Sequence, residues 1–249
     1  MRMRKKPRGK ERLSVLSALT VSVPADGGRV SFNFEKELPL RLEIGCGKGD
    51  FIRGLSRQEP DYNYLAMERC ADVAVIAMEK YAADRRLGRP YPQGGWEAPD
   101  GTVYKDTPWD IPLDMRGNVR FMPMEAGGLT DYFEGGIFES IYANFSDPWP
   151  KKGHARRRLT HPDFLERYLY LLRPGGYFRF KTDNAGLFAY SLEMLENSPF
   201  TITFVTHDLH SSERADNNIM TEYERNFTAK GFPIHMVEAR KDEQPAQTL

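Results

Sequence analysis

The sequence has few residues that could crosslink it and none of the long apolar runs that enter a membrane. Its two cysteines, Cys46 and Cys70, are too few for a disulfide framework or a four-cysteine zinc site. No apolar run approaches the ~18 residues of a membrane-spanning helix. The basic N-terminus is not followed by the apolar stretch of a secretory signal. We therefore expect a cytoplasmic protein that needs neither a membrane nor a metal.

Net charge is absent too, but the balance hides a local asymmetry. The 35 Lys and Arg residues match the 35 Asp and Glu residues. Residues 1–12 nevertheless hold seven basic residues against one acid, and residues 151–158 hold five basic residues and no acid. Concentrated basic segments on a near-neutral protein can bind a polyanion locally. The first segment is equally compatible with a solvated tail, so the second, which lies inside the domain, carries more weight.

What is present is a succession of strand and helix patterns from about residue 40. A chain of 249 residues is long enough for one large domain. The alternation predicts an α/β fold with a doubly wound, mostly parallel seven-stranded sheet and helices on both faces. We divide the chain into a basic arm and lead-in over 1–39 and a domain over 40–249. The expected strands are 40–45, 62–67, 118–124, 140–145, 177–181, 200–205 and 234–238, with helices at 51–56, 71–87, 161–172 and 187–195.

One stretch, 89–116, breaks this rhythm. It contains five prolines, three glycines and two tryptophans, and it shows no periodicity. Connections of this length are unusual in compact domains and are often functional or mobile. We predict a long excursion between the second helix and the third strand, and we assign it no role.

A glycine-rich turn follows the first strand. Glu43 precedes Gly45, Gly47 and Gly49, and the next strand ends at Glu68. Glycines let the backbone approach a ligand closely. In a doubly wound sheet, a carboxylate after the second strand accepts hydrogen bonds from ribose hydroxyls. The third glycine arrives one residue too early for the G-x-G-x-x-G spacing of dinucleotide folds. An acid two residues before the first glycine suits a positive amino group, which favours S-adenosylmethionine over NAD.

The fourth strand runs into a stiff loop that presents charged and aromatic side chains. Asp147, Trp149 and Lys151 lie in it, with Pro148 and Pro150 on the two sides of the indole. Ligands bind at the carboxyl ends of parallel strands, so this loop is a candidate for the chemistry. Asp beside Pro is also ordinary turn chemistry. The basic residues that follow make a plain turn the weaker interpretation.

Three weaker signals have structural explanations. His207, Asp208 and His210 span too few residues to make a complete metal site. The two cysteines are explained as small buried thiols rather than nucleophiles. Thr221 and Glu224 have the spacing of a helix capping box, which does not exclude a second role for the carboxylates.

Four segments together carry a resemblance to a known family. They are LEIGCGKG at 42–49, NFSDPWPKKGHARRRLT at 144–160, FKTDNAGLFAYSLE at 180–193 and NNIMTEYERNF at 217–227. In these segments the chain closely resembles the bacterial tRNA (guanine-N7-)-methyltransferases, and the resemblance covers nearly the whole chain. The 89–116 excursion is longer than the connection typical of that family. The resemblance implies a class I methyltransferase fold, S-adenosyl-L-methionine as methyl donor, and a guanine in the variable loop of tRNA as acceptor.

The resemblance also implies roles for individual residues. The donor-binding residues would be Glu43, Gly45, Gly47, Glu68, Glu125 and Asp147, with Glu125 standing where the family more often has Asp. The substrate-binding residues would be Lys151, Asp183, Thr221, Glu222, Tyr223 and Glu224. The RNA would run along Gly153, His154, Ala155, Arg156, Arg157 and Arg158. Asp147 is the expected catalytic residue.

Guanine N7 has a free lone pair, so the expected reaction needs alignment of the reactants and no general base. A carboxylate beside the base would stabilise the positive charge that develops on it. We expect Asp147 to do so, with Asp183, Glu222 and Glu224 holding the base. The alternatives are a methyltransferase acting on another RNA or a small molecule, an NAD-linked dehydrogenase, and a non-catalytic RNA-binding relative. A monomer and a homodimer are both compatible with the sequence.

Overall fold

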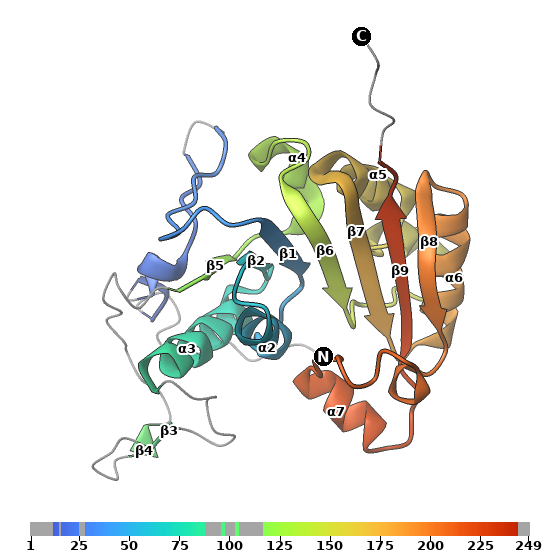
Figure 1. Cartoon of the computed structure of the whole chain (residues 1–249). Coiled ribbons are helices and arrows are strands. Elements are labelled where there is room, and N and C mark those ends of the chain that lie inside the picture. Colours follow the sequence, from blue (N-terminus) through green and yellow to red (C-terminus); the bar gives the residue numbers. More distant parts are fainter. Residues whose placement is uncertain are drawn as a thin grey trace.

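A seven-stranded sheet with helices on both faces forms the centre of the structure (Figure 1). The computed structural model describes residues 12–14, 16–24, 28–87, 96–97, 103–104 and 117–243. The strands of the sheet are β1 (Leu40–Ile44), β2 (Asn63–Met67), β5 (Val119–Met122), β6 (Phe138–Asn144), β7 (Leu172–Thr182), β8 (Phe200–Thr206) and β9 (His235–Lys241). The helices are α2 (Asp50–Gln58), α3 (Ala71–Leu87), α4 (Leu129–Tyr132), α5 (Pro162–Leu171), α6 (Ala185–Glu196) and α7 (Glu222–Thr228).

The connections of the sheet reverse direction between β1 and β6. The strand order is β5-β2-β1-β6-β7-β9-β8. β5, β2, β1, β6 and β7 run parallel to one another, whereas β9 runs antiparallel to both β7 and β8. Such a reversal leaves a crevice outside the carboxyl ends of the two central strands. The predicted doubly wound, mostly parallel sheet is confirmed.

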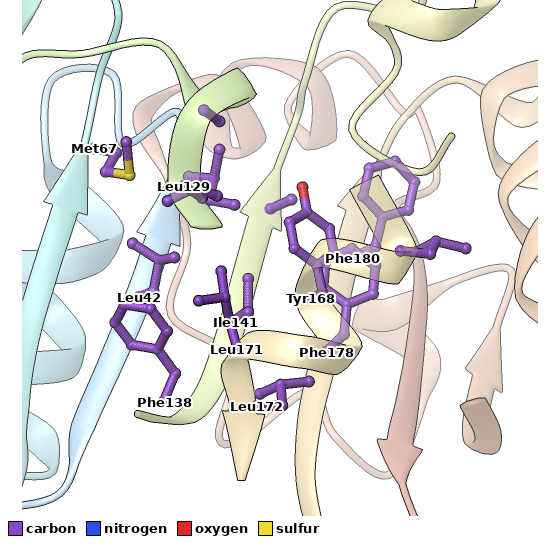
Figure 2. Packing of buried hydrophobic residues seen from close by; sticks show 14 of the residues in the cluster. Leu42, Met67, Leu129, Phe138, Ile141, Tyr168, Leu171, Leu172, Phe178 and Phe180 are labelled. Carbon is purple, nitrogen blue, oxygen red and sulfur yellow. The ribbon is translucent and has the colours of Figure 1, made fainter. Parts of the chain in front are cut away.

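Alternation along the strands divides the core between the two faces. Leu42 and Ile44 of β1 belong to the hydrophobic cluster that packs with α4, α5 and α6, part of which is shown in Figure 2. Tyr64 and Ala66 of β2 belong to the cluster on the opposite face, with α2 and α3. Successive side chains of a strand point to opposite faces, so Glu43, between Leu42 and Ile44, faces the α2 side.

Most of the predicted elements are present, with shifted ends. β7 begins at Leu172, directly after α5, and passes through a turn in which Gly175 has a φ of 72°. β9 continues to Lys241, beyond the predicted end at 238. The 89–116 excursion contains a short antiparallel pair, β3 (Trp96–Glu97) and β4 (Val103–Tyr104), and its remainder lies outside the described residues.

The described part of the predicted lead-in packs against the domain. Leu16 and Leu19 are buried in the cluster on the α2 side, and Thr20 pairs with Phe121 of β5. Arg12, which we counted with the basic arm, forms an ion pair with Glu79 of α3 at 2.6 Å. Residues 1–11 lie outside the described residues. The described lead-in therefore adds to the core of the domain.

Candidate functional site

Two adjoining cavities open at the carboxyl ends of β1, β2 and β6. The larger, of about 570 Å³, lies between the glycine turn, the ends of β2 and β5, and the loop after β6. The smaller, of about 280 Å³, lies between the glycine turn and α7, which Figure 1 shows at this edge of the sheet. Their walls share Gly45, Gly47, Asn144 and Phe145. Small-molecule sites commonly have volumes of ~300–1,000 Å³ and occur at such reversal points.

The three glycines of the turn do two different jobs. Gly45, Gly47 and Gly49 have left-handed φ values of 75°, 56° and 79°. A Cβ at Gly45 or Gly47 would meet no atom within 4 Å, so these positions leave the backbone open toward the cavities. A Cβ at Gly49 would lie 2.8 Å from the Cβ of Ala77, so this glycine lets α3 pack closely. The turn therefore leaves open space at Gly45 and Gly47, and contact of a ligand with these two glycines stays a prediction.

Glu43 is buried beside the smaller cavity and has one unpaired oxygen. Its Oε1 accepts a hydrogen bond from Asn144 Nδ2 at 3.1 Å, while Oε2 is buried without a hydrogen-bond partner. Burial raises the pKa of Glu43 to about 7, opposed by the hydrogen bond from Asn144 and by the charge of Lys181. A buried acceptor without a partner is costly. Glu43 is therefore suited to receive a cationic group of a ligand.

The acids after β2 and β5 both line the larger cavity. Glu68 Oε2 accepts a hydrogen bond from the Gly47 N–H at 3.1 Å, and Oε1 accepts one from the Cys70 N–H at 2.8 Å. Each carboxylate oxygen can accept further bonds. Glu125 precedes a short 3-10 helix, is exposed, and lines the same cavity. Both carboxylates can thus bind hydroxyl or amino groups of a ligand.

The loop 145–150, which we call the Asp147 loop, turns sharply at both ends. Phe145 and Trp149 have φ values of 54° and 42°, left-handed conformations that are strained for residues other than glycine. Between them, Asp147 is exposed and lines the larger cavity. Its Oδ2 accepts a hydrogen bond from Arg69 Nη2 at 3.1 Å. Strained backbone of this kind clusters at functional sites.

The basic segment 151–158 contains arginines of two kinds. Arg156 and Arg157 are exposed and line the larger cavity, and the Arg157 guanidinium lies over the Trp149 ring. Arg158 instead turns inward. Its Nε donates to the carbonyl of Pro148 at 3.1 Å, and its Nη2 donates to that of Trp149 at 3.0 Å. These two donors hold the Asp147 loop, and the RNA contact that we expected of Arg158 stays a prediction.

The other members of the segment lie around a 3-10 helix over Lys152–Arg157. Lys151 and Gly153 are exposed, whereas His154 and Ala155 are half-buried. The His154 ring packs edge-on against Trp149, with 5.8 Å between ring centroids. The segment therefore presents Lys151, Arg156 and Arg157 to solvent beside the cavity.

Asp183 and Tyr223 lie near the Asp147 loop. The Tyr223 ring packs against Phe145, with 5.1 Å between centroids, and the residue is 44% exposed. Burial and the charges of Asp183 and Asp147 raise the pKa of Tyr223. Asp183 itself is half-buried directly after β7. The structure thus brings Asp147, Asp183 and Tyr223 into one neighbourhood, although they are distant in the sequence.

The start of α7 closes the smaller cavity. Thr221 Oγ1 accepts a hydrogen bond from the Glu224 N–H at 2.9 Å, so the predicted helix cap is confirmed. Glu222 forms an ion pair with Lys48 of the glycine turn at 2.7 Å. Glu224 is fully buried, and its Oε2 lies 2.8 Å from Lys181 Nζ. Direct contact of Glu224 with guanine, which we expected, conflicts with this burial.

Asp50 follows the glycine turn directly and lines the smaller cavity. It begins α2 and binds Arg225 of α7 and Lys80 of α3. Burial would raise its pKa, but Lys80, Arg53 and Arg225 hold the pKa below its ordinary value. A carboxylate at a helix N-terminus was the available signal. The sequence-based prediction also omits Lys181 from the site. The available signal was a lysine within an apolar strand, which indicates a buried charge that needs a partner.

The described ranges contain no group of three or more His, Cys, Asp or Glu placed to hold a metal ion. His210 Nε2 lies 3.1 Å from Thr228 Oγ1, and the His207 ring packs against that of His235. Cys46 is buried and Cys70 is partly buried.

Among the described residues, no helix combines the length and the apolar character needed to cross a membrane.

Comparisons with known proteins agree with this architecture. A family model described as "Putative methyltransferase" matches residues 37–237. A tRNA (guanine-N(7)-)-methyltransferase of Listeria welshimeri is 40% identical over 243 residues, which cover 97% of this chain and 99% of that protein. The Bacillus subtilis protein of the same name is 39% identical over 239 residues, with coverage of 96% and 98%. The solved 16S rRNA methyltransferase KamB shares the fold, with a TM-score of 0.54 at 13% identity over 86% of this chain and 96% of that one.

Proposed function

The chain belongs to the tRNA (guanine-N(7)-)-methyltransferase family, and on that premise we propose that it methylates tRNA. The methyl group passes from S-adenosylmethionine to N7 of a guanine in the variable loop, which gives 7-methylguanosine. One observation supports placing this reaction at the two cavities: Oε2 of Glu43 is buried without a hydrogen-bond partner beside the smaller cavity, which the glycine turn also lines.

The residues around the two cavities fit S-adenosylmethionine. Its ammonium group needs an anionic acceptor, and Oε2 of Glu43 is one without a partner. Glu68 would accept hydrogen bonds from the ribose hydroxyls, and Glu125 one from the adenine amino group. The open sides of Gly45 and Gly47 leave room for the ligand against the backbone. These acceptors suit a cationic ligand better than the pyrophosphate of a dinucleotide.

S-adenosylmethionine supplies a methyl group carried on a positively charged sulfur. Guanine N7 has a free lone pair, so the protein has to align the reactants and exclude water, and it need not remove a proton. As N7 accepts the methyl group, positive charge develops on the base. Asp147, which lines the larger cavity, would stabilise that charge. Left-handed backbone at Phe145 and Trp149 shapes the loop that carries Asp147, and its carboxylate is hydrogen-bonded to Arg69.

Side chains next to Asp147 would hold the guanine. The N1–H and the exocyclic amine of guanine are donors, and Asp183 and Glu222 offer carboxylate acceptors. Adenine presents no matching pair of donors. The half-exposed ring of Tyr223 can stack on a base. We therefore assign base recognition to Asp183, Glu222 and Tyr223, with Thr221 fixing the start of α7.

The exposed basic residues beside the cavity would bind the tRNA backbone. Lys151, Arg156 and Arg157 are exposed, and the two arginines line the larger cavity. Contacts to phosphates supply affinity that falls with salt concentration. The target guanine lies in folded RNA, so it has to be exposed before it enters the site. We place the reaction in the cytoplasm, with a monomer or a homodimer as the acting species.

The test is to incubate the protein with an unmodified tRNA transcript and methyl-labelled S-adenosylmethionine, and to map the labelled nucleotide. Label on N7 of a variable-loop guanine is the expected result. Label on another nucleotide would assign the enzyme a different RNA site. Donor binding without any transfer would favour the non-catalytic relative or another substrate, and absence of donor binding would contradict the proposal.

A further inference from the structure

We propose that Lys181 is a positioning residue that holds the segment 217–224 beside the smaller cavity. In this proposal Glu224 is the buried partner that anchors Lys181, and it does not contact guanine. The inference rests on the proposed function, because the segment leads into the residues that would hold the base. It reassigns a carboxylate for which the sequence predicts substrate contact.

The Lys181 ammonium group donates three hydrogen bonds to this one segment. Its Nζ donates to Asn218 Oδ1 at 3.0 Å, to the Ile219 carbonyl at 3.0 Å and to Glu224 Oε2 at 2.8 Å. An ammonium group has three protons to donate, so three acceptors saturate it. These contacts fix the chain on both sides of the turn that leads into α7. Lys181 thus adds to the Thr221 cap in fixing the segment that leads into α7.

Glu224 is as fully committed as its partner. The Lys181 side chain is 1% exposed and that of Glu224 is 0% exposed. The second carboxylate oxygen of Glu224, Oε1, accepts a hydrogen bond from Asn218 Nδ2 at 2.6 Å and lies 3.2 Å from His210 Nε2. A base therefore cannot contact Glu224 unless the segment first moves away from the sheet. Removing one member of such a pair leaves an uncompensated buried charge, which is strongly unfavourable.

The sheet connects this anchor to the donor side of the site. Lys181 of β7 is the register partner of Asn144 of β6, and Asn144 donates to Glu43. Beyond the anchor, Glu222 and Tyr223 line the smaller cavity together with Glu43. The distance between the Glu43 carboxylate and the start of α7 is thus set across three neighbouring strands, β1, β6 and β7. By binding the segment 217–224, Lys181 fixes Glu222 and Tyr223 in the wall of the smaller cavity.

A double-mutant cycle separates an anchor from a reader. Glu224→Gln, Lys181→Met and the double variant are compared with wild type for KM and kcat on tRNA, and amide hydrogen exchange is followed over 217–228. Asp216→Asn serves as the matched control, because it removes an exposed carboxylate directly before the segment. We expect Glu224→Gln to lower kcat/KM at least about tenfold and to speed exchange in the segment. Adding Lys181→Met should recover part of that loss and slow the exchange, because no buried charge remains unpaired, although the hydrogen bonds of Lys181 are lost as well.

Two results together would overturn the inference: losses of kcat/KM that multiply in the double variant, and amide exchange at the wild-type rate in Glu224→Gln. Glu224 would then be assigned to guanine contact. If Lys181→Met alone does not fold, recovery of a folded protein in the double variant supports the anchor, and a double variant equally unable to fold overturns it. The exchange measurement needs no tRNA activity. If the wild-type protein does not methylate tRNA, the proposed function is contradicted, but the exchange measurement still tests whether Glu224 is an anchor.

Discussion

Arg69 and Asp147 form an ion pair on the wall of the larger cavity, with 3.1 Å between Nη2 and Oδ2. Both side chains are more than half exposed. A pair this exposed contributes at most ~1 kcal/mol to stability. A guanine that uses Asp147 competes with Arg69 for the carboxylate. The ion pair therefore keeps Asp147 oriented at little cost to substrate binding.

Replacing Asp147 by Asn tests the electrostatic role of its carboxylate. The change keeps the size of the side chain and removes the charge that would face the methylated base. We expect kcat to fall by about 10²–10³-fold, in line with the loss of a group that stabilises transition-state charge. Arg69→Ala removes the competing cation and should leave KM for tRNA unchanged or lower it. The check is steady-state kinetics. A kcat of Asp147→Asn equal to that of wild type would exclude Asp147 from the mechanism.

The buried Glu43 makes stability depend on pH. Its pKa is raised from 4.5 to about 7, mainly by burial. The folded protein therefore binds more protons than the unfolded chain between these values, and this group's contribution to stability is lost as pH rises through 7. Glu43→Gln should gain stability relative to wild type as pH rises from 5 to 8. Urea unfolding at several pH values measures this difference, and a gap that stays constant would contradict the assignment.

The same titration should appear in donor affinity. An ionised Glu43 attracts the donor's ammonium group, so S-adenosylmethionine should bind more tightly as pH rises from 6 to 8. Glu43→Gln should bind more weakly and lose this dependence. Calorimetric titration without tRNA gives both results. A pH profile that is the same in wild type and Glu43→Gln would show that another group controls donor binding.

The arginines of the basic segment should separate by their salt dependence. Arg156→Ala and Arg157→Ala are expected to weaken tRNA binding and to reduce the slope of log affinity against log salt by about one each. Arg158→Ala should leave that slope unchanged and lower kcat, because its guanidinium holds the carbonyls of the Asp147 loop. A slope change in Arg158→Ala as large as in Arg156→Ala would restore Arg158 to the RNA surface.

Two glycines of the turn should respond differently to alanine. Gly49→Ala adds a Cβ 2.8 Å from that of Ala77 in a left-handed backbone, so it should destabilise the fold by about 2–4 kcal/mol. Gly47→Ala meets open space and should cost about 1–2 kcal/mol through its φ alone. Its main effect should be weaker donor binding. Equal losses of stability in the two variants would contradict this division.

The sequence predicts the features that depend on short-range order. Buried strands, a glycine turn and acids at strand ends place Glu43, Glu68 and Asp147 at one edge of the sheet, because parallel strands end together. The contacts of Asp50 with Arg225 and of Lys181 with Glu224 join distant parts of the chain. Such pairs depend on tertiary packing and leave no periodic signal. A run of basic residues likewise does not reveal which guanidinium turns inward, as that of Arg158 does.

The most direct test of the central claim replaces N7 itself. A tRNA carrying 7-deazaguanine at the target position keeps the base-pairing edge and lacks the nucleophilic lone pair. We predict that it binds with an affinity close to that of unmodified tRNA, inhibits methylation of normal tRNA competitively, and accepts no label from methyl-labelled S-adenosylmethionine. Transfer of label to the 7-deazaguanine nucleotide would show that the acceptor is another atom and would contradict the account.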